Sequence, residues 1–114
     1  MADPTPESAV PEGASVFPLI PAELGVHPLL LASLHAIVFL EGSNADVVNG
    51  PAASEQMELI ATCLQRLSGD ELRRVREDVA TLLGYAKHEK WPKGSVQFLK
   101  SFLDEFGIGQ NHEQ

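Results

Sequence analysis

The chain has 114 residues, 44% of them hydrophobic, a formal net charge of -8 and a single cysteine, Cys63. Its length gives one small domain, and its excess of acid disfavours nucleic acid and anionic membranes as partners, because both repel a negatively charged protein. One cysteine excludes an internal disulfide, and the longest apolar run is too short to span a bilayer. The first thirteen residues contain no Lys or Arg, unlike the start of a signal peptide. These features predict a cytoplasmic protein.

The charge is unevenly distributed along the chain. Residues 1–65 hold eight acidic residues and no Lys or Arg, whereas residues 66–114 hold eight acidic and eight basic residues, so the whole net charge of -8 belongs to the first part. This distribution favours a basic protein as partner, and the alternative is that the acidity only maintains solubility.

The first 25 residues form a proline-rich, acidic segment that cannot sustain a helix or a central strand, because it contains five prolines. We expect a flexible tail up to about Ser15. The sequence VFPLIP at residues 16–21 is apolar, and we predict that this strap lies extended across the helices. An exposed docking peptide of the P-x-x-P type is the alternative. The predicted organisation is therefore a tail with a strap over residues 1–25, a helical domain over residues 26–108 and a frayed end over residues 109–114.

The first long helix is predicted to begin at Pro28, since proline suits the first helical position, and to stop at Gly42. Its sequence LLLASLHAIVFLE is apolar nearly all round, which is typical of a central, mostly buried helix. A strand is the alternative, but the chain contains no second strand of similar strength to pair with it.

Turn-forming residues follow over 42–54. A second helix is expected from Pro51 or Ser54 to about Leu67. Its predicted buried face comprises Met57, Ile60, Ala61, Leu64 and Leu67.

The third helix is predicted over residues 69–89, with Ser68 and Glu71 forming a capping box at its start. Two pairs at four-residue spacing, Arg74 with Asp78 and Arg73 with Glu77, are expected to point outward and meet on the surface. Its predicted core stripe comprises Leu72, Val75, Val79, Leu82, Leu83 and Ala86.

The fourth helix is predicted from Pro92 to Phe106. Gly107 is expected to be its left-handed cap, with Ile108 folding back on Leu103 in a Schellman motif. Its predicted core stripe comprises Phe98, Leu99, Phe102, Leu103 and Phe106. Four helices with short connections indicate an all-α fold, a small antiparallel four-helix bundle.

The stretch KHEKWPKG, residues 87–94, is the candidate partner-binding site. It combines cations, a histidine and the only tryptophan, and Tyr85 lies one helical turn before His88. Aromatic and cationic side chains together often anchor protein interfaces. The predicted binding residues are Tyr85, Lys87, His88, Lys90, Trp91 and Lys93. The alternative is a structural joint, in which the cations oppose the negative end of the helix dipole and Trp91 covers the gap between two helices.

The remaining reactive residues carry weaker signals. His35 lies in the most apolar helix, and a role in a small enzyme or ligand carrier would pair it with Glu41, six residues later. Cys63 lies next to a core position and is expected to be buried and inert. The sequence contains no zinc, EF-hand, phosphate-loop or nucleophile-elbow motif, so it predicts no metal and no cofactor.

These features favour a non-catalytic helical adaptor that binds another protein, one that is basic in composition. Two alternatives stay open: an acidic inhibitor or immunity-type protein that neutralises a basic partner, and an enzyme or carrier using His35 and Glu41. A symmetric homodimer through an exposed apolar face is also open.

Overall fold

The computed structural model describes residues 12–109, so the predictions for residues 1–11 and 110–114 lie outside the described residues. Within the described range the chain forms helices and no strand. The elements are the 3₁₀ helix η1 (Ala22–Leu24) and the α-helices α2 (Pro28–Gly42), α3 (Gly50–Leu64), α4 (Gly69–His88) and α5 (Lys93–Glu105). The predicted all-α fold, a small helical bundle, is confirmed. Among the described residues, no helix has both the length and the apolar content needed to cross a bilayer.

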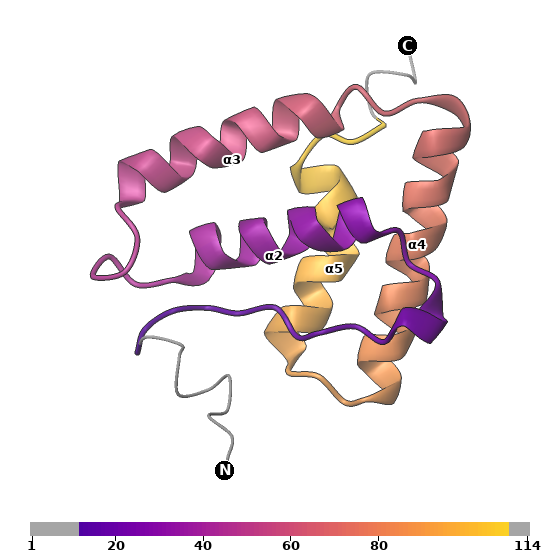
Figure 1. The fold of residues 1–114 in the computed structure, drawn as a ribbon, viewed down its shortest axis with the longest axis horizontal. Helices are drawn as coiled ribbons and strands as arrows, with labels where there is room; N and C mark the ends of the chain where they lie inside the picture. The colour runs from indigo at the N-terminus through magenta and orange to yellow at the C-terminus, as the bar shows by residue number, and fades with distance from the viewer. Residues whose placement is uncertain (1–11, 110–114) are drawn as a thin grey trace.

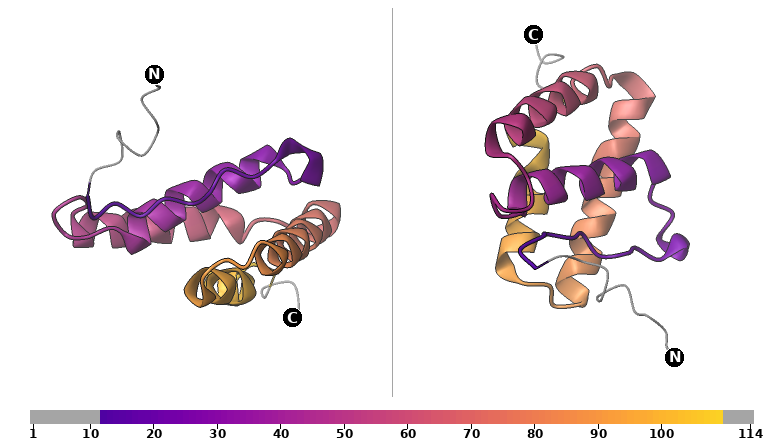
Figure 2. Two further views of the ribbon diagram at one scale, coloured as in Figure 1. Left: turned by 90° about the horizontal axis from the view of Figure 1, so that it is seen from below. Right: turned by 60° about the vertical axis from the view of Figure 1, so that its left-hand side comes forward.

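The helices form two antiparallel hairpins, α2 with α3 and α4 with α5, which are stacked crosswise (Figure 1). The two hairpins occupy two layers, and the N-terminal segment lies beside α2 in the outer layer (Figure 2). This segment, residues 12–27, crosses the α4–α5 hairpin close to the turn that joins those helices. The outer layer thus consists of the N-terminal segment, α2 and α3, and the inner layer consists of α4 and α5.

The core lies between the two layers. The largest fully buried side chains are Leu34, Ile37, Leu82, Leu99 and Phe102, which come from α2, α4 and α5. The core stripes predicted for α4 and α5 are confirmed, since every residue in them is either buried or partly buried against the core. Helix α3 is more peripheral: its predicted face packs against the core only in part, and its one fully buried residue is Ala53.

The prediction that α2 is mostly buried is wrong. Only Leu30, Leu34 and Ile37 are buried, whereas Leu29 is 72% exposed and Phe39 is 39% exposed. The helix lies in the outer layer, so α4 and α5 cover one side of it and α3 covers one edge. An all-round apolar sequence does not distinguish a helix that is covered on every side from one that is covered on one side only.

Helix α2 begins at Pro28 as predicted, and His27 caps it by accepting a hydrogen bond at Nδ1 from the backbone N–H of Leu29, 3.0 Å away. Ser68 occupies the predicted cap position of α4, but its side chain makes no capping hydrogen bond, so the predicted capping box is wrong. Gly69, directly after the cap, has a φ of 57°. This left-handed residue changes the direction in which the chain enters the helix and takes the Ser68 hydroxyl away from the first-turn amides.

The predicted Schellman motif at the end of α5 is confirmed. Gly107 is left-handed, with a φ of 67°, and the N–H of Ile108 donates to the carbonyl of Leu103 at 2.9 Å. Ile108 is thereby folded back into the core. The side-chain amide of Gln65, just after α3, donates to the carbonyl of Phe106 at 2.8 Å, so this turn also ties the two hairpins together.

The N-terminal segment is held at both ends. At its start, the N–H of Asn44 donates to the carbonyl of Gly13, and the N–H of Ser15 donates to the hydroxyl of Ser43 at 2.8 Å. At its middle, Phe17 is only 4% exposed and belongs to the core cluster. Residues 16–21 lie extended, and the hydrogen-bonded part begins slightly earlier, at Gly13.

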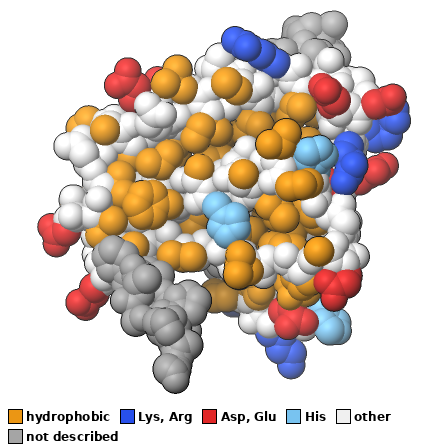
Figure 3. All heavy atoms as spheres, in the orientation of Figure 1, with side chains coloured by type: hydrophobic (Ala, Val, Ile, Leu, Met, Phe, Trp, Pro, Cys, Tyr) orange, Lys and Arg blue, Asp and Glu red, His pale blue; other side chains and the backbone are white. Residues whose placement is uncertain are grey.

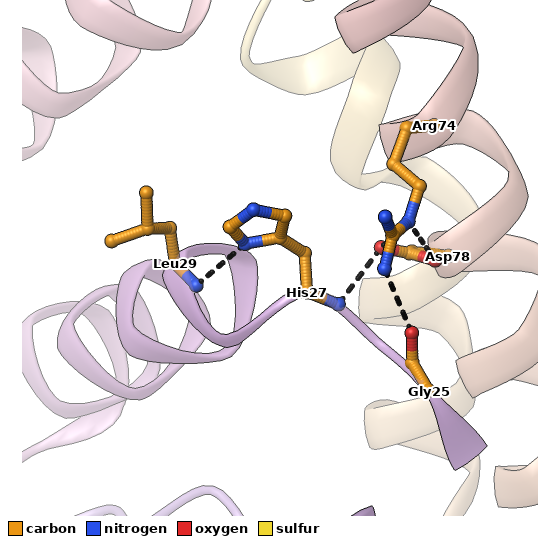
Figure 4. Close-up of polar contacts among 5 residues, drawn as sticks. All are labelled: Gly25, His27, Leu29, Arg74 and Asp78. Carbon is orange, nitrogen blue, oxygen red and sulfur yellow. Dashed lines mark hydrogen bonds and ion pairs between the residues drawn. The ribbon is translucent and has the colours of Figure 1, made fainter.

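The other end of the segment is held by Asp78, which is buried rather than pointing outward as predicted (Figure 4). Its carboxylate accepts from the backbone N–H of His27 at 2.9 Å and from Nε of Arg74 at 3.2 and 3.1 Å. Arg74 also donates to the carbonyl of Gly25 at 2.9 Å. The predicted Arg74–Asp78 pair therefore forms, and it also anchors the start of α2.

The second predicted pair on α4 is wrong. Arg73 pairs with Asp70, three residues earlier, rather than with Glu77. Both partners are exposed, so the exchange has little energetic consequence.

Candidate functional site

The stretch KHEKWPKG forms the turn between α4 and α5. Helix α4 ends at His88, and Lys90 takes a left-handed conformation with a φ of 59°. The N–H of Trp91 then donates to the carbonyl of Ala86 at 2.9 Å, which brings the indole back against the end of α4. Trp91 is half-buried and packs against the core cluster.

Four rings meet where the strap crosses this turn. Phe17 makes edge-to-face contacts with Trp91, at 5.7 Å between ring centroids, and with His35 of α2, at 5.4 Å. Trp91 makes a further edge contact with Tyr85, at 6.0 Å. These contacts join the strap, α2, α4 and the turn, and each aromatic pair adds about 0.5–1.5 kcal/mol beyond its burial. Trp91 therefore has the packing role that the structural alternative predicted, and Tyr85, which that alternative did not include, packs against it.

The other members of the predicted site, Lys87, His88, Lys90 and Lys93, are exposed. His88 Nδ1 lies 3.2 Å from a carboxylate oxygen of its neighbour Glu89. Their role in partner binding stays a prediction, because their exposure is equally compatible with a solvated helix end.

We expect the triple variant Lys87→Glu, Lys90→Glu, Lys93→Glu to remain folded, because exposed positions tolerate substitution within about 0.5 kcal/mol each. Circular dichroism and a thermal melt check this. Affinity capture from a native lysate then compares the variant with the wild type: loss of a captured protein assigns a binding role to the turn, and an unchanged set of proteins leaves it as a joint only.

His35 and Glu41 do not meet in a common hollow. His35 is half-buried against Phe17, whereas Glu41 is exposed and borders a hollow of about 430 Å³ between the strap, α2 and α5, whose lining does not include His35. Over residues 12–109, no three His, Cys, Asp or Glu side chains are grouped so that they could hold a metal ion. His35 thus makes the contacts of a packing residue.

An apolar surface covers the outer side of the α2–α3 hairpin and was missed by the sequence predictions. Figure 3 shows hydrophobic side chains gathered over this face, with the charged side chains around its edge. On α2 the surface consists of Leu29, Ala32, Ala36 and Phe39, all exposed. On α3 it includes Leu59, which is 54% exposed, and Cys63, which is exposed rather than buried as predicted. We call these six residues the outer face.

A groove of about 570 Å³ opens beside Leu29, where the start of α2 meets the end of α3 and the start of α4. Its apolar walls include Leu30, Leu64, Leu67 and Val75, and its polar rim is formed by His27, Asp70, Glu71 and Arg74. The volume lies within the range of pockets that take small molecules or large side chains. Leu29 and Cys63 of the outer face also line the groove, so the two features are continuous.

The charges of the outer layer are all negative. Over residues 12–65, which make up this layer, the exposed acidic residues are Glu12, Glu23, Glu41, Asp46, Glu55 and Glu58, and the sequence has no Lys or Arg there. The segment from Leu29 to Leu40 contains no Asp, Glu, Lys or Arg. The outer face is thus an apolar surface whose own layer carries only acidic charge, and basic residues of the neighbouring α4, Arg74 among them, lie at the groove end.

The sequence contained a signal for this surface. Helix α2 is apolar on all sides, and a chain of this length has too few other helices to cover such a helix completely.

Comparison with protein-family models, with curated proteins and with solved structures gives no significant match.

Proposed function

We propose that the protein is a non-catalytic helical interaction module that binds another protein through the outer face. The observation that carries this proposal is the exposure of Leu29 and Phe39 at the two ends of a helix stripe that contains no charged residue. Contiguous exposed apolar surface on a small protein is typical of an interaction site, because leaving it in water forgoes stabilisation of about 25 cal/mol per Å².

The centre of the outer face also supports this role. Ala32 and Ala36 lie between the two larger residues and are exposed. Small side chains there allow a partner to approach the backbone of α2 closely. The core does not need these alanines to be apolar, since α2 already packs inward through Leu30, Leu34 and Ile37.

A second candidate is an acidic inhibitor or immunity-type protein that neutralises a basic partner. The all-negative outer layer favours it. Ionic strength separates the two functions. Binding by mainly electrostatic neutralisation weakens steeply with salt, because exposed charges are screened within about 8–10 Å. Binding at the outer face, where apolar contact supplies most of the affinity, weakens only several-fold and persists at high salt.

The test is a charge placed at the centre of the outer face. We expect Ala36→Arg to abolish capture of the native partner from a lysate, because the guanidinium would have to be buried without a counter-charge. The matched control is Ala80→Arg, at an exposed alanine within α4 of the inner layer. The control is expected to fold and to capture the partner as the wild type does. Capture of the same proteins by the wild type and Ala36→Arg would contradict the proposed function.

A further inference from the structure

The outer stripe of α2 has the spacing of a helix–helix seam. Leu29, Ala32, Ala36 and Phe39 are separated by three, four and three residues, the alternation that places side chains along one line facing a second helix. At 100° per residue this stripe lies on the opposite side of α2 from the buried stripe of Leu30, Leu34 and Ile37. Helix α2 is therefore patterned to pack on two sides, and the structure fills one of them.

The dimensions of the outer stripe define the length of the missing element. From Leu29 to Phe39 the helix rises about 15 Å, which corresponds to about three turns of a partner helix. The alanines at the centre allow the two helix axes to approach closely, toward the lower end of the usual 8–10 Å. Larger side chains of the partner are accommodated at the end, where the groove beside Leu29 is open.

The charged residues around the outer stripe indicate the charge that the partner carries. The acidic residues on the elements that bear the stripe, Glu41, Asp46, Glu55 and Glu58, are exposed, and these elements carry no Lys or Arg. At the groove the charges are mixed, because Asp70 and Glu71 line it together with Arg74. A helix with Lys or Arg beside its apolar stripe gains from this surround, and one with Asp or Glu is repelled. A second copy of this chain presenting the same face would bring two acidic surrounds together.

We propose that the outer face binds an amphipathic helix of a partner protein, about three turns long, with an apolar stripe at heptad spacing and basic residues on its flanks. The inference rests on the proposed function and specifies the partner for the same surface. A large apolar side chain of that helix occupies the groove between Leu29, Leu64 and Val75.

The experiment is selection from a displayed library of helical peptides of about 18 residues, which is five helical turns, against the full chain. Half of the library carries randomised apolar stripes with basic flanks, and half carries the same stripes with acidic flanks. We expect the enriched peptides to be basic-flanked and to lose affinity by at least about tenfold for Ala36→Arg but not for Ala80→Arg. Their affinity should also fall several-fold as salt is raised.

Three results would overturn the proposal: no enrichment, enrichment of acidic-flanked or non-helical peptides, or binding that Ala36→Arg leaves unchanged. A second copy of this chain is the other candidate for binding the outer face, and sedimentation of the protein alone tests it. A dimer that Ala36→Arg dissociates would assign the face to a second copy and overturn the proposal. Capture from a lysate distinguishes failure of the helix proposal from failure of the proposed function. A partner captured through the outer face, together with no helical basic binder, rejects the helix and keeps the interaction module.

Discussion

Replacing Phe17 by alanine is expected to lower the free energy of unfolding by about 3 kcal/mol. Phe17 is 4% exposed and is the strap residue that enters the core, where it contacts the rings of His35 and Trp91. Truncation leaves a cavity at the junction of the strap, α2 and the α4–α5 turn, and removes two edge-to-face contacts. Urea unfolding followed by circular dichroism measures the change.

The control for this prediction lies two residues along the same strap. Leu19 is 86% exposed, so Leu19→Ala removes a side chain of similar character without opening a cavity and is expected to change stability by less than about 0.5 kcal/mol. Equal effects of the two substitutions would show that the strap does not share the cooperative unfolding of the helices, contrary to the burial of Phe17.

Replacing Asp78 by alanine is expected to cost about 2 kcal/mol. The carboxylate accepts hydrogen bonds from the N–H of His27 and from Arg74, and its loss leaves the partly buried N–H of His27 without its acceptor. The cost is smaller than that of a fully buried pair, because Arg74 is about half exposed and keeps its bond to the carbonyl of Gly25. Chemical unfolding measures the loss.

Asp70→Ala is the matched control for Asp78→Ala. Asp70 also pairs with an arginine of α4, but its side chain is 91% exposed, so its loss should cost less than about 1 kcal/mol, including its favourable position near the helix N-terminus. If both variants lowered the free energy of unfolding equally, the hydrogen bond from the N–H of His27 to Asp78 would add no more stability than an exposed ion pair.

Local sequence signals predicted much of the fold. Pro28 at the start of a helix and Gly107 at the end of another each impose a backbone conformation, so the elements near them were placed within a residue or two. The stripes of α4 and α5 were predicted for a similar reason, since charged residues on their other sides leave one apolar side. Ser68 shows the limit of this approach, because the left-handed Gly69 that follows it redirects the chain.

The candidate site was harder to predict because its residues give no periodic contrast. Helix α2 has apolar residues on every side, so the spacing of its stripes does not show which of them faces solvent, and the exposure of Leu29 and Phe39 could not be predicted. Burial there depends on how the two hairpins cross, which is decided by packing between distant parts of the chain. Trp91 was correctly expected to cover a helix junction as one alternative, but its contact with Phe17 joins residues 74 positions apart, and no local pattern contains it.

The pairing of each helix with its neighbour in sequence has a consequence for how the chain folds. Both hairpins consist of contacts between adjacent segments, and such local topology closes quickly because little loop entropy is lost. The strap is the exception. It is synthesised before the helices that hold it, and it has no complete binding place until Trp91 and the start of α5 have emerged from the ribosome, so Phe17 is among the last of the described residues to reach its native contacts.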